Sequence, residues 1–266
     1  MSSQYQCGYI ALVGKPNTGK STLMNALVGE KLSITADRPQ TTRHQILGIK
    51  TTDKYQCIFI DTPGIHDSNH KAIHRYMNRA ATSMLADADL ICVLLDIRHF
   101  NKEDEAILQR VGQHKKLLIV LNKIDQLSKS VILSHLPQGL PQFPDDQLTD
   151  KSMRFITAEI IREKLFRLLT QELPYSITVS VDHYIEETDI TRISATIWVE
   201  RKSQKAIVIG KNGSLLKKVG SLARADIEHL IQARVYLQLW VKVREDWSDD
   251  EKSLAAFGYS DANPSH

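Results

Sequence analysis

Eight consecutive residues near the start of the chain combine glycine, lysine and hydroxyl side chains at a spacing suited to phosphate. They are Gly14, Lys15, Pro16, Asn17, Thr18, Gly19, Lys20 and Ser21, with Thr22 next, and they follow the apolar run 9–13. Glycines at both ends let backbone N–H groups point inward at an anion, Lys20 can reach the outer phosphates, and the Ser21 hydroxyl can hold Mg²⁺. A helix that begins at Lys20 directs the positive end of its dipole at the same anion. The pattern predicts a nucleotide phosphate site, with a plain glycine-rich turn as the alternative.

Two further segments carry side chains suited to a nucleotide. Asp61, Thr62, Pro63 and Gly64 follow the apolar run 55–60, and Asn122, Lys123, Ile124 and Asp125 follow the run 117–121. Asp61 can hold Mg²⁺ through water, and the N–H of Gly64 can contact a γ-phosphate, which distinguishes a triphosphate from a diphosphate. The Asp125 carboxylate can accept two hydrogen bonds from guanine, whereas adenine presents an acceptor there. Lys123 can lay its alkyl stem on the base. Together the three segments predict a GTP site.

Short β-rich runs alternate with helical segments through the first half of the chain. The runs cover residues 9–13, 55–60, 90–95 and 117–121, and amphipathic stretches cover residues 72–85 and 103–111. Nearly continuous apolar strands separated by helices are typical of a parallel sheet covered on both faces. The carboxyl ends of such strands, and any ligand, lie along one edge. We therefore expect an α/β fold in which the three nucleotide segments meet at that edge.

Composition indicates an ordinary soluble chain. Its 266 residues suffice for about two domains, 42% are hydrophobic and 24% are charged, and the net charge of +3 is too small to argue from. No apolar run approaches the roughly 18 residues of a membrane span, and the start lacks a signal-peptide pattern, so a cytoplasmic protein is expected. Cys7, Cys57 and Cys92 lack C-x-x-C spacing and are expected to be small buried hydrophobes without a disulfide or a metal.

The motifs resemble those of the translation-factor-like class of GTP-binding proteins, which implies a P-loop GTPase domain with bound GTP or GDP and Mg²⁺. In that class a mobile switch loop lies between the phosphate loop and Asp61, and the polar segment 33–44 fits it. One threonine of the loop completes the Mg²⁺ shell. The resemblance favours Thr42, with Thr41 as the alternative, and assigns the metal to Ser21, Thr42 and Asp61.

The same resemblance bears on catalysis. It assigns catalytic roles to Lys20, Thr42 and Gly64, and it places Ile65 where many signalling GTPases carry a glutamine that orients the attacking water. Isoleucine cannot orient water. We therefore expect slow intrinsic hydrolysis, raised either by K⁺ near Asn17 or by a bound partner.

The match to this class is interrupted after Asp125. Residues 126–137 leave no room for the helix, the strand ending in a Ser-Ala motif and the final helix that the class carries, about 30 residues by usual element lengths. Either the chain is shortened there or residues are missing from the numbering. A Cα–Cα step well above about 3.8 Å near Ser128 would show the second. A true deletion would weaken nucleotide affinity and the edge of the sheet.

A proline-rich segment, residues 137–149, predicts a stiff linker between a GTP-binding domain at residues 1–136 and a second domain at residues 150–266. In the second domain the patterns predict helices at 151–170, 214–219, 221–231 and 249–257, and strands at 177–181, 193–200 and 235–243. The apolar run at 205–209 is too short for its periodicity to distinguish a helix from a strand. The last helix is expected to begin with a capping box formed by Ser248 and Glu251.

If residues 205–209 are helical, the order of elements resembles an α+β KH domain of type II, whose G-x-x-G turn clamps a nucleic-acid backbone beside about four unstacked bases. The predicted RNA-binding residues are Arg201, Lys202, Lys205, Gly210, Lys211, Asn212, Gly213, Lys217, Lys218 and Arg224. Positions 200–224 contain seven cationic residues and a single acidic residue, Glu200, and this excess of positive charge favours binding of single-stranded RNA. The alternative is a solvent-exposed charged face around an ordinary turn. Trp240 and Trp247 fit either packing or stacking on RNA.

Four strings extend the resemblance to the Era family of bacterial GTPases over nearly all of the chain: residues 40–44, 158–165, 172–176 and 237–243. That resemblance implies a monomer that binds the 3′ end of small-subunit (16S) ribosomal RNA during 30S assembly, with a loose peripheral association at the inner membrane. We expect a coupled switch in which GTP and RNA favour each other's binding. A constitutive RNA-binding module with a structural nucleotide domain is the alternative, and a P-loop kinase is disfavoured by the segment 122–125.

Overall fold

The computed structural model describes residues 5–35, 41–63, 71–83, 88–96, 99–112, 116–122, 136–169 and 173–259. The chain divides into two compact units. The first comprises Met1–His70 and His74–Asp150, and the second comprises Lys71–Ile73 and Lys151–His266.

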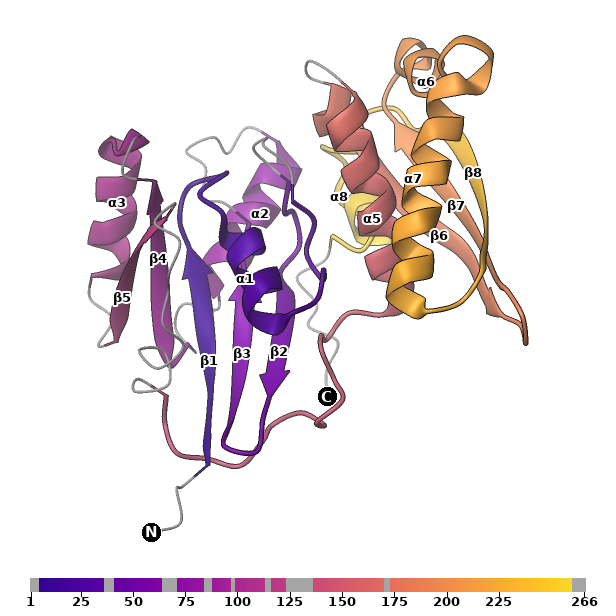
Figure 1. Ribbon diagram of the computed structural model, residues 1–266. Helices are drawn as coiled ribbons and strands as arrows, with labels where there is room; N and C mark the ends of the chain where they lie inside the picture. The colour runs from indigo at the N-terminus through magenta and orange to yellow at the C-terminus, as the bar shows by residue number, and fades with distance from the viewer. Residues whose placement is uncertain are drawn as a thin grey trace. The chain divides into compact units, whose positions relative to one another are not determined.

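The sheet of the first unit has five strands in the order β2-β3-β1-β4-β5 (Figure 1). They are β1 (Gln6–Val13), β2 (Ile46–Thr51), β3 (Tyr55–Asp61), β4 (Leu90–Asp96) and β5 (Leu117–Asn122). β1 is parallel to β3 and β4, and β4 is parallel to β5, whereas β2 is antiparallel to β3. The predicted α/β fold with a mostly parallel sheet is therefore confirmed. The strand order reverses at β1, which is where open α/β sheets bind ligands.

Helices cover both faces of this sheet. They are α1 (Lys20–Val28), α2 (Ala72–Ser83) and α3 (Lys102–Val111). α1 packs on the face that carries Gly48, because a Cβ on Gly48 would meet the Met24 side chain at 2.9 Å. Gly48 is in one row with Ile10 across the sheet, whereas Val111 of α3 packs in a cluster with Ala11. Side chains alternate along a strand, so α1 and α3 lie on opposite faces.

The segment from Leu136 to Asp150 is hydrogen-bonded along the first unit. The N–H of Cys7 donates to Pro137 O at 3.1 Å, and the N–H of Ile49 donates to Leu148 O at 2.8 Å. The side chain of Gln56 accepts from the N–H of Gln142 at 2.7 Å. The proline-rich segment is thus fixed by backbone contacts along much of its length. The three cysteines are buried, as predicted.

The second unit is a three-stranded sheet, in the order β6-β7-β8, with three of its helices packed on one face (Figure 1). Its elements are α5 (Met153–Leu168), β6 (Ile177–Glu186), β7 (Thr191–Val199), α6 (Lys202–Ile209), α7 (Ser214–Ile231), β8 (Val235–Val243) and α8 (Glu251–Ala256). β6 is antiparallel to β7, and β7 is parallel to β8. The alternating residues Ile193, Ala195, Ile197 and Val199 point into the core, as predicted, together with residues of α5 and α7.

The apolar run at 205–209 lies in helix α6, so the order of elements is that of a type II KH domain. Val208 of α6 is fully buried in the core of the second unit.

No described helix is both long enough and apolar enough to cross a membrane.

Three details of the sequence prediction are wrong. Strand β2 was not predicted, although it pairs with β3 over its whole length. The two helices predicted at 214–219 and 221–231 are one helix, which continues through Gly220. The last helix is capped by Asp250, whose carboxylate accepts from the N–H of Ser253 at 2.9 Å, because the Ser248 hydroxyl donates to Glu200 instead.

Candidate functional site

The phosphate loop follows β1 and has the backbone that its motif requires. Asn17 and Gly19 have φ of 63° and 92°, and a Cβ on Gly14 would lie 2.5 Å from the carbonyl oxygen of Leu94. The loop therefore turns tightly against β4 and delivers the chain into α1. Pro16, Thr18 and Thr22 lie in or beside this turn. Its backbone N–H groups can converge on an anion.

Lys20 is held inside the loop and is buried. Its Nζ donates to the carbonyl oxygens of Gly14 and Lys15 at 2.9 and 2.7 Å. Burial lowers the pKa of Lys20 to about 8, with a smaller opposing effect from the charge of Asp61. An anionic phosphate would stabilise the ammonium form of Lys20.

Lys15 was predicted to contact nucleotide, but its side chain is directed elsewhere. Its Nζ lies 2.5 Å from the carboxylate of Asp104 and 2.8 Å from the carbonyl oxygen of His99. Asp104 is fully buried at the start of α3, where it forms a capping box with Asn101. The side chain of Lys15 therefore fixes the phosphate loop to α3, and its backbone N–H remains the group that can face phosphate.

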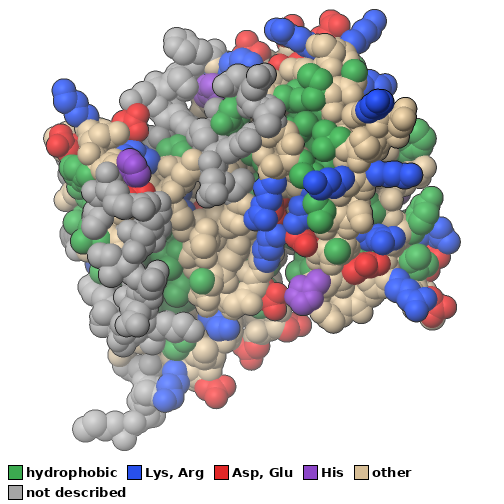
Figure 2. Space-filling view, turned by 45° about the horizontal axis from the view of Figure 1, so that its top comes forward, with side chains coloured by type: hydrophobic (Ala, Val, Ile, Leu, Met, Phe, Trp, Pro, Cys, Tyr) green, Lys and Arg blue, Asp and Glu red, His purple; other side chains and the backbone are tan. Residues whose placement is uncertain are grey.

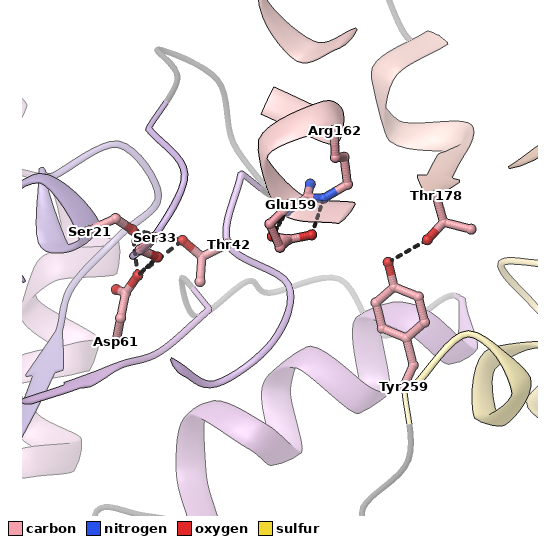
Figure 3. Close-up of polar contacts among 8 residues, drawn as sticks. All are labelled: Ser21, Ser33, Thr42, Asp61, Glu159, Arg162, Thr178 and Tyr259. Carbon is pink, nitrogen blue, oxygen red and sulfur yellow. Dashed lines mark hydrogen bonds and ion pairs between the residues drawn. The ribbon is translucent and has the colours of Figure 1, made fainter. Parts of the chain in front are cut away.

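Three predicted metal residues come together beside this loop (Figure 3). The Ser21 hydroxyl donates to Oδ2 of Asp61 at 2.6 Å, and it lies 2.8 Å from the Thr42 hydroxyl. Thr42, the switch-loop threonine that the resemblance favours, thus lies next to Ser21. Oδ1 of Asp61 is buried and has no hydrogen-bond partner among the described residues. Burial raises the pKa of Asp61, while hydrogen bonds from the hydroxyls oppose that rise.

This oxygen cluster fits Mg²⁺. Hydroxyl and carboxylate oxygens are the donors that this hard cation takes, usually together with water and phosphate oxygens. The orphaned Oδ1 of Asp61 would gain a partner, and the cation would stabilise the charged carboxylate that burial disfavours.

Ser33 is a member of this cluster that the sequence did not single out. Its hydroxyl donates to Oδ2 of Asp61 at 2.6 Å, and Asn25 of α1 holds the surrounding backbone through its carboxamide. Thr62, directly after the end of β3, donates its hydroxyl to the carbonyl oxygen of Leu12 at 2.9 Å, which fixes the end of the strand. The available sequence signal was a serine in the predicted switch loop, which did not identify its partner.

The other predicted nucleotide residues lie at the same sheet edge or outside the described residues. Asp61 is opposite Leu12 in the register of β3 and β1, and Asn122, the last residue of β5, is opposite Asp96. Pro63 follows Asp61. Gly64, Ile65, Lys123, Ile124 and Asp125 lie outside the described residues, as do residues 126–135, where the interruption was predicted.

In the second unit the G-x-x-G turn connects α6 to α7 through left-handed backbone. Gly210, Asn212 and Gly213 have φ of 74°, 52° and 73°. A Cβ on Gly210 would lie 2.8 Å from Cβ of Leu215, whereas nothing lies within 4 Å of a Cβ on Gly213. Gly210 therefore permits close packing within the protein, and Gly213 leaves space for a ligand. The helix α7 begins next to it without a side-chain cap, so its first N–H groups can meet an anion.

The predicted RNA-binding cations lie at the start of α6 and along it, in the turn and on the first part of α7. Arg201, Lys202, Lys211, Lys217, Lys218 and Arg224 are exposed and Lys205 is half-buried. Among the described residues none of the seven forms an ion pair. Figure 2 shows Lys and Arg side chains interspersed with hydrophobic ones on this unit. The exposed Ile207 of α6 and Leu222 of α7 were not predicted; they add apolar surface to these two helices.

The two tryptophans with open roles differ in burial. Trp247 is fully buried, donates its indole N–H to the carbonyl oxygen of Ser176 at 3.1 Å, and packs against Phe257. Trp240 is 52% exposed. Tyr259 closes the same region through a hydroxyl contact with Thr178 at 3.1 Å (Figure 3). Trp247 therefore has a packing role, and Trp240 is free to contact a ligand.

Comparison with known proteins identifies both units. The family described as "50S ribosome-binding GTPase" matches residues 9–123, and the KH domain family matches residues 172–248. The chain is 42% identical over 292 residues to GTPase Era of Pseudomonas putida strain W619, covering 96% of this chain and 97% of the relative. It is 43% identical over 293 residues to GTPase Era of Ectopseudomonas mendocina strain ymp, covering 96% and 98%.

Two solved structures are similar over the same extent. One is a variant of Aquifex aeolicus Era bound to GDP and AlF4⁻, and the other is Era in complex with MgGDPNP and nucleotides 1506–1542 of 16S ribosomal RNA. Each has a TM-score of 0.91 and 34% sequence identity, and each match covers 96% of this chain and 99% of the other.

The alignments also bear on the predicted interruption. The alignment to the Pseudomonas putida relative spans 292 positions, whereas 96% of this chain is about 255 residues. About 37 positions of the alignment therefore have no counterpart in this chain. The match to the GTPase family ends at residue 123, close to the point where the sequence pattern is interrupted.

Proposed function

Because the chain belongs to the Era family of GTPases, we propose that it is a GTP-binding and GTP-hydrolysing switch whose second unit binds the 3′ region of small-subunit ribosomal RNA and assists 30S assembly. The observation that carries the nucleotide part is the convergence of Ser21, Thr42 and Asp61 beside the buried Lys20. It unites a phosphate loop, a switch-loop hydroxyl and a carboxylate with an orphaned oxygen in one place.

In this proposal each predicted nucleotide-binding segment of the first unit has a defined role. The phosphate loop presents its backbone N–H groups, and Lys20 exchanges the carbonyl oxygens of Gly14 and Lys15 for phosphate oxygens. Ser21, Thr42 and Asp61 hold Mg²⁺, which supplies neutralisation of the charge on the β- and γ-phosphates. The N–H of Gly64 contacts the γ-phosphate, and the segment 122–125 selects guanine.

Hydrolysis is expected to be slow because Ile65 cannot orient water. We propose K⁺ near Asn17, or a bound partner, as the source of acceleration. Single-turnover GTP hydrolysis in K⁺ and in Na⁺, each with and without RNA, tests this proposal. Fast hydrolysis that neither K⁺ nor RNA alters would contradict it.

The RNA part of the proposal is supported by the open Gly213, the uncapped start of α7 and the seven exposed or half-buried cations without a counter-ion among the described residues. Backbone clamping at the turn and charge neutralisation around it are the contacts that KH domains use. The RNA class is proposed from the solved Era complex with nucleotides 1506–1542 of 16S ribosomal RNA. A monomeric state and a loose peripheral association at the inner membrane are proposed on family resemblance; sedimentation and membrane fractionation test them.

Coupling between the units distinguishes a switch from its alternative. If GTP orders the segments around Thr42 and Asp61 and thereby favours RNA binding, then RNA must favour GTP by the same factor. The affinity for a 16S 3′ fragment is measured with GDPNP, with GDP and without nucleotide. We expect at least a fivefold difference between GDPNP and GDP, within the usual range of coupling energies of about 1–3 kcal/mol.

A constitutive RNA-binding module is the second candidate, favoured by the roughly 37 alignment positions that have no counterpart here. It predicts equal RNA affinity in all three nucleotide states. In a second experiment the corresponding residues of the Pseudomonas putida relative are inserted after Asp125. If the insertion strengthens GDP binding but leaves pyrophosphate binding unchanged, the base contacts were incomplete and the phosphate site was intact.

A further inference from the structure

The sheet of the second unit has an outer face that carries exposed aromatic residues. β8 packs Leu239 in the core on the helix side, so Tyr236 and Trp240 point to the opposite face. Tyr236 and Trp240 are 51% and 52% exposed. In the register of the sheet Ile185, Arg192 and Tyr236 form one row across the three strands, and Ile185 is 52% exposed. Large apolar side chains thus lie open on one face.

Cations border these rings. The Arg192 guanidinium carbon lies 5.6 Å from the centroid of the Tyr236 ring, and Lys242 Nζ lies 5.6 Å from the centroid of Trp198. Two carboxylates lie on or beside the same face: Glu187 accepts from Nε of Arg192 at 2.9 Å, and Asp182 accepts from the Thr196 hydroxyl at 2.7 Å. The Arg192 guanidinium is thus paired with Glu187, and Lys242 is a cation of this face that forms no ion pair among the described residues.

The fold covers the other end of this face with its own aromatic residues. Phe257 packs on Trp198 with ring centroids 5.4 Å apart, and Tyr259 contacts Thr178. No described residue covers Tyr236 and Trp240 in this way. Two aromatic rings half in water are costly in apolar surface, and exposed rings beside cations are characteristic of surfaces that bind single-stranded nucleic acid.

We propose that the outer face of β8 is a second contact surface for single-stranded RNA, on which Tyr236 and Trp240 stack with bases while Lys242 contacts a phosphate. The inference rests on the proposed RNA-binding function and extends it beyond the G-x-x-G turn. Stacking on aromatic rings tolerates any base, so this surface adds length and affinity to the site more than it adds sequence selection.

The geometry of β8 gives one RNA strand access to both surfaces. β8 is an edge strand in the order β6-β7-β8. Its inward Leu239 approaches α7, with Cδ1 3.5 Å from the position of a Cβ on Gly220. The same strand therefore borders the helix side that carries the G-x-x-G turn and presents Tyr236 and Trp240 on its outer side. An RNA clamped at the turn can pass around the free edge of β8 onto the outer face.

The experiment uses the full chain and a ladder of oligoribonucleotides from 4 to 16 nucleotides, all sharing one end and taken from the 3′ region of 16S ribosomal RNA. Binding is measured by fluorescence anisotropy of labelled RNA. The parent is compared with Tyr236→Ala/Trp240→Ala and with Tyr236→Phe/Trp240→Phe, which keeps two aromatic rings. Lys211→Asp/Asn212→Asp places two carboxylates on the G-x-x-G turn and tests the proposed function itself. Circular dichroism and thermal melting establish that each variant is folded.

We expect the alanine pair to bind the shortest RNAs as the parent does and to lose about tenfold or more per stacked base with the longest ones. The phenylalanine pair should keep most of that affinity. If the alanine pair matches the parent along the whole ladder, or changes only self-association in sedimentation, the inference is wrong and the proposed function stands. If the carboxylates at the turn leave every affinity unchanged, the proposed RNA-binding function fails, and the inference fails with it.

Discussion

Substitution of Asp104 by alanine is expected to disrupt the phosphate loop from a distance. Lys15 Nζ lies 2.5 Å from Oδ2 of Asp104, and the two side chains are 10% and 0% exposed. Removal of one partner leaves the buried ammonium without its counter-charge, which costs about 3–5 kcal/mol in comparable buried pairs. Asp104 also accepts from the N–H of Asn101 at 3.0 Å, so the start of α3 loses its capping box as well.

The loss should be visible as a lower melting temperature of the first unit. For a unit of about 150 residues each kcal/mol corresponds to about 2–4 °C, so Asp104→Ala should lower the transition by roughly 6–20 °C. The transition that GDP raises identifies the first unit, because a ligand stabilises the unit that binds it. GDP affinity should fall too, since the carbonyl oxygen of Lys15 receives hydrogen bonds from Lys20 and Thr18.

Two controls isolate the ion pair. Glu105→Ala removes an exposed carboxylate from the same first turn of α3 and should shift stability by no more than about 1 kcal/mol. Lys15→Met combined with Asp104→Ala removes both charges and should recover most of the loss. The reasoning is refuted if Asp104→Ala and Glu105→Ala have the same melting temperature, or if the double-mutant cycle yields no coupling energy between Lys15 and Asp104.

Three further outcomes follow from the same unit. Burial lowers the pKa of Lys20 to about 8, and phosphate binding requires the charged form, so GDP affinity should fall as pH rises above 8. Calorimetry in buffers of different ionisation enthalpy should show that GDP binding takes up a proton at pH 8.5 but little at pH 7. Equal proton uptake at the two pH values would contradict this prediction. Ser33→Ala removes a hydrogen bond of 2.6 Å to Asp61 and should destabilise the nucleotide-free protein by about 1.5–3 kcal/mol, whereas Ser33→Thr should not; equal melting temperatures would contradict this. Ile119 and Leu121 are 49% and 46% exposed on β5, an edge strand of the described sheet, so lysine at both positions should reduce light scattering on concentration; unchanged scattering would show that this edge does not drive association.

The sequence predicted the parallel strands of the first unit well because each is a short, continuous apolar run. β2 escaped because it is an antiparallel edge strand, with Gly48 in its middle, directly after a polar switch segment. A hairpin signal was present, since only residues 52–54 separate β2 from β3. Alternation of strands and helices, which revealed the other strands, says nothing about such a hairpin.

The candidate sites divide in the same way. Motif spacing brought Ser21 and Asp61 together correctly, because both follow strands that end at one edge. Spacing could not show that Lys15 turns to Asp104 or that Ser33 turns to Asp61, because these pairs join residues 89 and 28 positions apart, with no sequence signal for the partner. In such cases the tertiary structure, and not the local pattern, determines what a side chain contacts.

The nucleotide site has a phosphate end and a base end, which are formed by different segments of the chain. At the phosphate end Lys20, Ser21, Thr42 and Asp61 are fixed by contacts to the loop backbone or β3, and Lys15 is fixed to α3, whereas Gly64 lies outside the described residues. The base end depends on the segment after Asn122, near the place where the family match ends. Binding energy from phosphate and Mg²⁺ does not discriminate between bases, whereas unpaired polar groups around the wrong base do. A chain shortened at that end should therefore retain the response to phosphate and lose selectivity for guanine first, which separates loss of specificity from loss of the switch.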